Sequence, residues 1–236
     1  MREDQLAVIL EPRRPGLARG IDRRRLESMG CRIDAASRSA MRVWVRPDDL
    51  DQLAQHPEVA HIRLPVRAHP NQGSAISQGV ALTGADILQS AQFDALSESQ
   101  SAGDLSPVVE QIDVTGDGFA GGTPRGVNVA EVMLDMAPGA SLALLKIADS
   151  LDFENAIEWA NQNGVDAGAI ALGFAGLSYY DDTGVISDAV NESARNHDVF
   201  WAVSAGNYAE SHWRGSWSGA TGTASLSSTR ASSASD

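Results

Sequence analysis

The stretch Ser141-Leu142-Ala143-Leu144-Leu145-Lys146-Ile147 is a short apolar run between two longer amphipathic segments. Such a run predicts a β-strand that is covered on both faces, as in a parallel sheet. On its N-terminal side, Val127 to Met136 predicts a helix. On its C-terminal side, Asp152 to Asn163 predicts another, with Asp152 as the N-cap. A buried strand between two helices favours an α/β architecture.

The same alternation continues outward from this stretch. Apolar runs at Val108–Val114, Val165–Leu172 and Val199–Ser204 predict strands, and Ile186–Asn196 predicts a further helix. Strands that alternate with helices form parallel sheets whose faces the helices cover. We therefore expect a parallel-sheet α/β domain over residues 108–213.

The N-terminal region has a shorter period. Its order of predicted elements is β-α-β-β-α-β, the pattern of a small α+β domain of the ferredoxin-like kind. We place this domain at residues 1–70. The predicted strands are Leu6–Leu10, Cys31–Ala35, Met41–Val45 and Val59–Leu64, and the predicted helices are Asp22–Met29 and the segment between Pro47 and Pro57.

Two segments lack this regular pattern. Residues 71–107 are rich in Ser, Gln and Gly and end at Pro107, and we expect a linker with one short helix near Gly84–Phe93. Residues 214–236 consist largely of Ser, Thr, Ala and Gly, and we expect a disordered tail.

Charge is distributed unevenly along the 236 residues. Residues 1–70 hold 13 of the 18 basic groups, all of them Arg, and 10 of the 31 acidic groups, a net charge of +3. The remaining residues carry −16, and the chain as a whole carries −13. This total argues against general nucleic-acid binding. The split is consistent either with a charge-matched contact between the two regions or with two independently solvated surfaces.

No apolar run approaches the ~18 residues that a membrane-spanning helix requires, so no membrane span is expected. We expect no secretory signal either, since the N-terminus reads Met1-Arg2-Glu3-Asp4, and the compartment stays unassigned. The single cysteine, Cys31, excludes a scaffold held by intramolecular disulfides.

Four stretches give the chain a resemblance to the subtilisin-like serine proteases (subtilases) with their N-terminal propeptide. Residues 5–64 resemble the βαββαβ propeptide. Arg125-Gly126-Val127-Asn128-Val129-Ala130-Glu131 resembles the helix start that carries the catalytic histidine. Ala171-Leu172-Gly173 resembles the strand that lines the substrate cleft, and Ser204-Ala205-Gly206-Asn207 resembles the turn that supplies the oxyanion hole. The resemblance implies a truncated subtilisin-like domain and peptide-bond hydrolysis.

The chain departs from the family pattern at each member of the catalytic triad. Arg125 occupies the histidine position, and a guanidinium with a pKa above 12 cannot act as a general base. Alignment on Phe93 places Ser90 at the position of the catalytic aspartate, with Asp94 off the motif. Gly222-Thr223-Ala224-Ser225 follows the Asn207 turn too closely to be the nucleophile motif, so we expect the serine region to be missing.

The resemblance therefore implies an inactive member of the family. It assigns Asn207 to the oxyanion hole and Ala171, Leu172 and Gly173 to substrate binding. It implies a peptide or protein as substrate, with no cofactor and no metal. Two alternatives stay open. In one, residues 1–70 bind, inhibit or help fold an active subtilase; in the other, the chain is a remnant without a function of its own.

Other motifs point elsewhere and are weaker. Gly116 to Gly121 matches the G-x-G-x-x-G pattern of dinucleotide sites, but Asp117 and the late helix start after Pro124 count against a phosphate site. Asp113 and Asp117 begin a calcium-loop pattern that Pro124 fails to complete.

Three histidines, His56, His61 and His69, fall close together in the N-terminal region. A zinc site needs convergent ligands, usually with cysteine or carboxylate partners. We favour structural roles for them.

Overall fold

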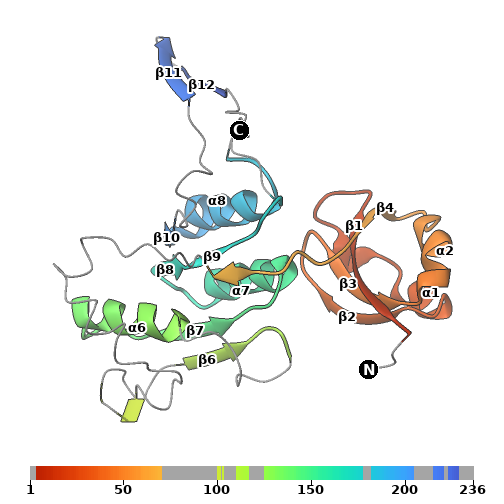
Figure 1. Ribbon diagram of the computed structural model, residues 1–236, viewed down its shortest axis with the longest axis horizontal. Coiled ribbons are helices and arrows are strands. Elements are labelled where there is room, and N and C mark those ends of the chain that lie inside the picture. Colours follow the sequence, from red (N-terminus) through yellow and green to blue (C-terminus); the bar gives the residue numbers. More distant parts are fainter. Residues whose placement is uncertain are drawn as a thin grey trace, which may run out of the picture.

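The computed structural model describes residues 4–70, 100–101, 103, 110–116, 125–177, 182–204, 215–220 and 223–228. Within these ranges the protein is a mixed α/β structure with one four-stranded antiparallel sheet and several small two-stranded sheets (Figure 1). Among the described helices, none combines the length and the apolar character that crossing a bilayer demands.

The N-terminal domain, residues 4–64, has the predicted β-α-β-β-α-β order, with two short 3₁₀ turns added. Its sheet order is β2-β3-β1-β4, and every neighbouring pair is antiparallel. Asp22 caps α1, since its side chain accepts a hydrogen bond from the Arg25 amide. The elements are β1 (Leu6–Pro12), α1 (Arg23–Ser28), β2 (Arg32–Ala36), β3 (Met41–Val45), α2 (Leu50–Ala54) and β4 (Val59–Arg63).

This domain has a hydrophobic core of its own. Alternate residues of β1 and β3 point to one face of the sheet, where the two helices cover them. Every member of the buried cluster lies between residues 8 and 59: Val8, Leu10, Ile21, Leu26, Cys31, Met41, Val43, Val45, Leu53 and Val59. These ten side chains thus form a core that lies entirely within the N-terminal domain.

The C-terminal part, residues 110–204 as described, alternates strand and helix as predicted. Strand β6 pairs in parallel with β7, and β8 pairs in parallel with β10. The elements are β6 (Glu110–Asp113), α6 (Arg125–Met136), β7 (Ala143–Lys146), α7 (Ser150–Gln162), β8 (Ala167–Ile170), β9 (Leu172–Gly173), α8 (Val185–His197) and β10 (Phe200–Val203).

Helix α7 begins earlier than predicted. Its N-cap is Asp149, whose side chain accepts hydrogen bonds from the amides of Leu151 and Asp152. The predicted cap, Asp152, is instead the third helical residue, and its carboxylate bonds back to the Asp149 amide. The prediction of Asp152 as the N-cap is wrong. Asp149 and Asp152 form a reciprocal capping box, and both are residues of a type that can cap a helix, so the sequence pattern does not distinguish them.

Residues Gly215–Ala220 (β11) and Thr223–Ser228 (β12) pair as an antiparallel hairpin, within the segment expected to be a disordered tail. Their small and polar composition carries little of the apolar alternation by which strands are recognised. The predicted short helix near 84–93 and the rest of the expected linker up to residue 99 lie outside the described residues.

A close contact joins β8, β10 and the two helices α7 and α8. Trp201 on β10 lies against Gly168 on β8, and its indole Nε1 donates a hydrogen bond to Ser193 Oγ at 2.9 Å. Ser193 in turn donates to Asn161 Oδ1 at 2.5 Å, which ties α8 to α7. This polar chain fixes the two helices relative to each other.

Gly168→Ala tests this packing. A Cβ at residue 168 would lie 2.2 Å from Trp201 Cζ3, so the indole must move and its bond to Ser193 breaks. We expect the free energy of unfolding to fall by about 1–3 kcal/mol in urea titration. The control is Gly126→Ala in α6, where a Cβ meets no atom within 4 Å, and where alanine should not destabilise the helix. Equal stability of both variants would contradict the packing.

Candidate functional site

Residues 66–70, the linking segment, are extended and lie against two regions of the C-terminal part: the residues that lead into α7, and β9. On one side, Arg67 forms an antiparallel bridge with Asp149. The Ala68 amide donates to the Ala148 carbonyl at 3.0 Å, and the Ser150 amide donates to the Val66 carbonyl at 3.1 Å. Here the linking segment pairs with the residues that lead into α7.

On its other side, the end of the linking segment pairs with β9. His69–Pro70 forms the short strand β5, whose residues lie opposite Gly173 and Leu172 in an antiparallel register (Figure 1). Leu172 and Gly173 are two of the three predicted substrate-binding residues, and Ala171 joins their strand to β8. The structure therefore brings this predicted site together with residues that precede it by about one hundred positions.

This arrangement can bind an extended peptide by strand addition. Backbone amides and carbonyls on two facing edges supply hydrogen bonds that do not depend on the sequence of the bound strand. The edges are residues 148–150 and β9, and the bound strand is a segment of the same chain. In this structure both edges pair with residues 66–70 of the same chain.

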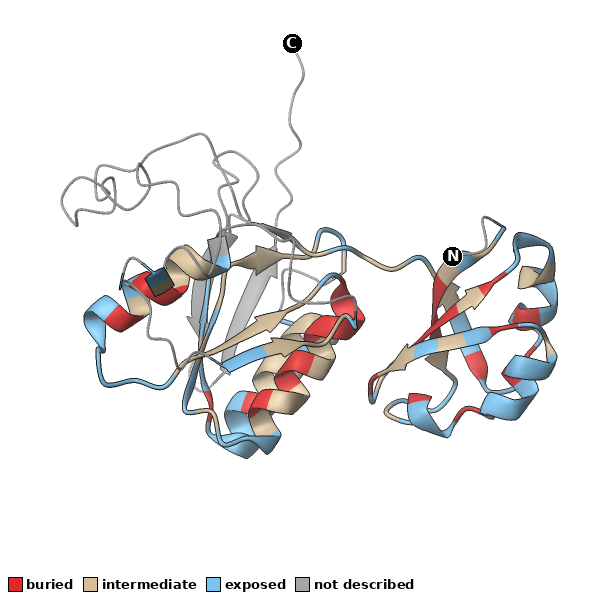
Figure 2. Ribbon diagram, turned by 90° about the horizontal axis from the view of Figure 1, so that it is seen from below, coloured by how far each residue is buried: buried red, intermediate tan, exposed pale blue. Residues whose placement is uncertain are grey.

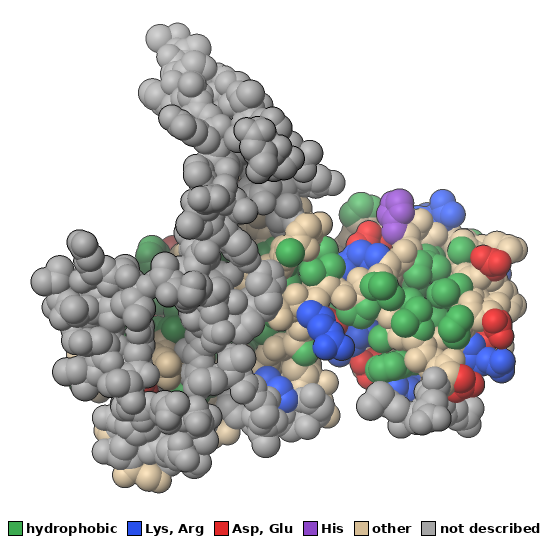
Figure 3. Space-filling view, in the orientation of Figure 1, with side chains coloured by type: hydrophobic (Ala, Val, Ile, Leu, Met, Phe, Trp, Pro, Cys, Tyr) green, Lys and Arg blue, Asp and Glu red, His purple; other side chains and the backbone are tan. Residues whose placement is uncertain are grey.

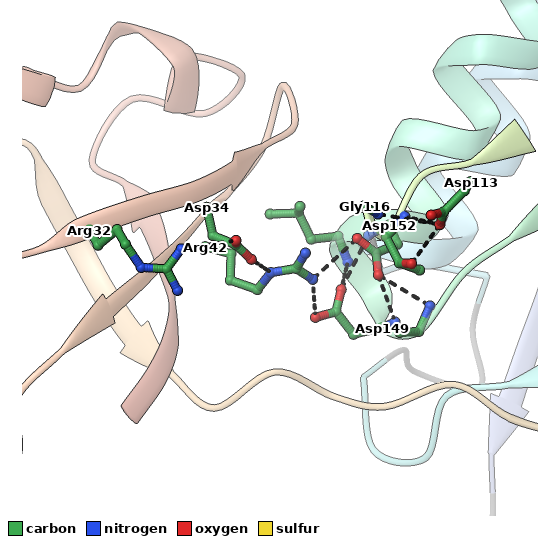
Figure 4. Close-up of polar contacts among 10 residues, drawn as sticks. Arg32, Asp34, Arg42, Asp113, Gly116, Asp149 and Asp152 are labelled. Carbon is green, nitrogen blue, oxygen red and sulfur yellow. Dashed lines mark hydrogen bonds and ion pairs between the residues drawn. The ribbon is translucent and has the colours of Figure 1, made fainter. Parts of the chain in front are cut away.

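The N-terminal domain contacts the C-terminal part mainly through charged side chains that meet α7. Arg42 on β3 donates from Nη1 to Asp149 Oδ2 at 2.6 Å and to Asp152 Oδ1 at 3.1 Å (Figure 4). Its Nε donates to Asp34 Oδ2 at 2.7 Å within the N-terminal domain. The side chains of Arg42, Asp149 and Asp152 are 10%, 7% and 0% exposed, so this is a buried ionic cluster.

The causes of the pKa shift of Arg42 indicate which carboxylate interacts with it most strongly. Burial by itself lowers the pKa of Arg42, but the hydrogen bond and charge of Asp149, aided by Asp152, outweigh it, and the pKa is raised. The pKa of Asp152 is raised as well, by burial and by the charge of Asp149, against the opposing charge of Arg42. Since Asp149 also makes the shorter contact, we take Asp149 as the principal partner of Arg42.

The half-buried carboxylate of Glu154, also on α7, makes a second contact with the N-terminal domain. Ser37 Oγ donates to Glu154 Oε2 at 2.9 Å, and Ser39 Oγ donates to the same oxygen. Glu154 Oε1 is buried and accepts no hydrogen bond from the described residues. Burial raises the pKa of Glu154, although the two hydroxyl groups oppose the shift.

Two exposed ion pairs complete the contact. Arg19 forms a two-bond pair with Glu158 at 3.0 and 2.6 Å, and Arg38 pairs with Glu192 on α8 at 2.5 Å. Basic side chains are visible along the border between the two parts (Figure 3). The charge-matched contact is confirmed, while the alternative of two independently solvated surfaces is wrong for these residues.

The apolar share of the contact is small. Ile9 and Ala40 of the N-terminal domain form a buried cluster with Leu151 on α7. Figure 2 shows the buried stripe along α7 to which Leu151 belongs. Exposed ion pairs contribute only about 0–1 kcal/mol each, so Arg19 and Arg38 add little to the docking of the two parts.

The other predicted site residues are placed only in part. Arg125 is the first residue of α6, as the resemblance to a histidine-bearing helix start implies. Asn207, Ser90, Asp94 and Asp117 lie outside the described residues. The oxyanion-hole assignment of Asn207 therefore stays a prediction.

Asp113 is a candidate that the sequence analysis considered only for calcium. It is the last residue of β6, a parallel strand, and its Oδ1 accepts from the Thr115 amide at 2.9 Å, from Thr115 Oγ1 at 2.5 Å and from the Gly116 amide. Carboxyl ends of parallel strands are where α/β sheets carry functional side chains. In the sequence, this residue could have been found as the aspartate near the end of the strand predicted at Val108–Val114.

The alternative metal sites gain no support within the described part of the chain, which holds no group of three His, Cys, Asp or Glu side chains suited to a metal ion. His56 is buried, its Nδ1 accepts from the Glu58 amide, and burial together with the charge of Arg25 lowers its pKa. The rest of the G-x-G-x-x-G stretch after Gly116 lies outside the described residues.

Glu154→Gln tests the buried contact at Ser37 and Ser39. A raised pKa in the folded state means that the charged carboxylate opposes docking, so the contribution of Glu154 to stability is greatest at low pH and is lost as pH rises. A glutamine keeps an acceptor oxygen without the charge. We expect Glu154→Gln to be at least as stable as the wild type at pH 8, with the difference shrinking toward pH 4.

Glu154→Ala is the matched control, because it removes the acceptor that the two serine hydroxyls share and leaves Ser37 Oγ with the Ala40 carbonyl alone, at a cost of about 1–3 kcal/mol. Unfolding in urea at several pH values measures all three proteins. A Glu154→Gln variant that is less stable than the wild type at pH 8 would contradict this description of the contact.

Comparison with protein-family models and with curated proteins identifies no relative of this chain. The chain matches no protein-family model, and no curated protein is significantly similar to it.

Proposed function

We propose that the chain is a subtilisin-like protease family member in which a propeptide-like domain occupies the substrate cleft and in which peptide-bond hydrolysis is absent. The observation that carries this proposal is the linking segment. It leaves the N-terminal domain and runs as an antiparallel strand between residues 148–150 and β9. A product-like strand in the cleft is what the family resemblance of Leu172–Gly173 implies.

The order of elements supports the same reading. The N-terminal domain has the βαββαβ order and the sheet order expected of a ferredoxin-like propeptide. Parallel strands then alternate with α6, α7 and α8, and the two predicted cleft residues Leu172 and Gly173 form an edge strand. We accordingly assign the described C-terminal part to the first half of a subtilisin-like domain.

Asp113 fits the position of the catalytic aspartate better than Ser90. The family places this residue at the end of the first strand of the core, ahead of the histidine-bearing helix. Asp113 ends β6, and α6 follows with Arg125 as its first residue. The proposal thus retains the aspartate and replaces the histidine.

This replacement removes the general base. In the triad mechanism, an imidazole accepts the serine proton and later returns it to the leaving amine. A guanidinium stays protonated throughout the working range of pH and has no acceptor atom. With Arg125 at that position, the chain can bind an extended peptide but cannot activate a nucleophile toward it.

Absence of turnover is the first test. The purified chain is incubated with a fluorogenic peptide pool and with a serine-directed phosphonate, alongside an active subtilisin as the positive control. We expect no hydrolysis above the buffer blank and no phosphonate labelling. Turnover that the phosphonate blocks would contradict the proposal.

A second candidate function is that of an inhibitor or folding partner of an active subtilase. The observation in its favour is the self-contained core of the N-terminal domain, whose contact with α7 and α8 is mostly ionic. Such a domain can leave one partner and bind another of similar shape and charge. Here the function resides in residues 1–70 rather than in the cleft.

Inhibition measurements test this second function. The full chain is titrated into an active subtilisin, and we expect loss of peptide hydrolysis at micromolar concentration. Arg38→Glu, on the docking face, should weaken inhibition at least several-fold, whereas Arg13→Glu, outside the described contacts with the C-terminal part, should not. Absence of inhibition by the wild type would exclude this function for the enzyme tested.

A further inference from the structure

Three structural features meet at Asp149. Its side chain caps α7 through the amides of Leu151 and Asp152. The same carboxylate accepts the hydrogen bond of Arg42 from the N-terminal domain. Its backbone forms the bridge to Arg67, and its two neighbours in sequence make the hydrogen bonds that hold the linking segment.

We propose that Arg42 is a positioning residue, which acts through Asp149 to set the wall of the cleft and thereby the register of the linking segment. That the cleft binds substrate rests on the proposed function. The coupling between Arg42 and the linking segment rests only on the contacts given above. Docking of the N-terminal domain onto α7 and pairing of the linking segment with residues 148–150 are then coupled.

The geometry explains how a side chain on β3 can act on a backbone strand. Asp152 Oδ2 accepts hydrogen bonds from the Ala148 and Asp149 amides, at 3.1 and 3.3 Å, so the capping box fixes the backbone of the cleft wall. Arg42 bonds to the remaining oxygens, Asp149 Oδ2 and Asp152 Oδ1. It thus holds both carboxylates in the orientation that the capping box needs.

Burial makes this cluster sensitive to the loss of its cation. Two carboxylates that face each other without a countercharge repel, and each is nearly removed from water. When Arg42 is absent, the carboxylates must turn toward solvent or take up a proton, and either change disturbs the hydrogen bonds to residues 148 and 149. The strand that pairs with residues 148–150 then loses its partner edge.

The two exposed pairs have no such connection. Arg19 and Arg38 contact Glu158 and Glu192, which lie further along α7 and on α8. Their removal should weaken docking slightly without altering the register of the linking segment. This contrast separates positioning from general attraction between the two parts.

Hydrogen exchange followed by mass spectrometry tests the proposal on the full chain, with peptides that cover residues 64–70, 146–152 and 41–45. In Arg42→Met, we expect exchange in the first two peptides to accelerate at least tenfold, while the 41–45 peptide in the core of the N-terminal domain stays protected. Arg19→Met, the matched control, should change all three by less than twofold. Arg42→Lys should restore part of the protection, because a single ammonium can still reach Asp149.

Asp149→Asn separates the ion pair from the helix cap. Asparagine is as good an N-cap as aspartate but removes the charge that Arg42 binds. We expect it to accelerate exchange at residues 64–70 as Arg42→Met does. If Arg42→Met unfolds the N-terminal domain, exchange in Asp149→Asn still tests the proposal.

Unchanged protection at residues 64–70 and 146–152 in both Arg42→Met and Asp149→Asn would overturn the proposal. So would equal acceleration in Arg19→Met. These outcomes do not depend on hydrolysis or on inhibition of another enzyme, so this proposal can fail while the proposed function stands, and the reverse.

Discussion

The buried ion pair between Arg42 and Asp149 joins the two parts of the chain at the place where α7, the N-terminal domain and the linking segment meet. It lies where α7 begins, and residues 148–150 beside it pair with the linking segment and form one wall of the proposed peptide cleft. A buried ion pair is seldom a large source of stability, because the cost of desolvating both groups offsets their attraction. Its value here is specificity, since it accepts only one alignment of the two parts.

The uneven charge along the chain has a structural purpose in this account. Arginines of residues 1–70 meet carboxylates of α7 and α8, and among the described residues Ile9, Ala40 and Leu151 form a buried apolar cluster between the parts, with Ala35 packed against it. An interface of this kind suits a domain that has its own core and has to leave or rotate.

Much of the fold could be predicted from the sequence, because apolar alternation and Gly and Pro boundaries specify individual strands and helices. The βαββαβ order and the α6-β7-α7 unit both follow from such local signals. The cap of α7 was misplaced because Asp149 and Asp152 both carry cap chemistry. No local pattern marks the linking segment as a strand, since its partners are residues 148–150 and 172–173, far away in the sequence; only the family resemblance implies a product-like strand near Leu64 to His69. Alignment on Phe93 points to Ser90, whereas Asp113 stands at the end of β6, a position that becomes evident only once the strand is placed ahead of α6.

The direct test of the account is a nuclear Overhauser measurement on the full chain in solution. Arg67 and Asp149 face each other as an antiparallel pair whose hydrogen bonds lie on either side, the arrangement with the closest α-carbons. The account predicts a strong cross-peak between the Hα protons of Arg67 and Asp149, together with slow exchange of the Ala68 amide. Absence of that cross-peak, with rapid exchange at Ala68, would contradict the central claim that the chain fills its own cleft.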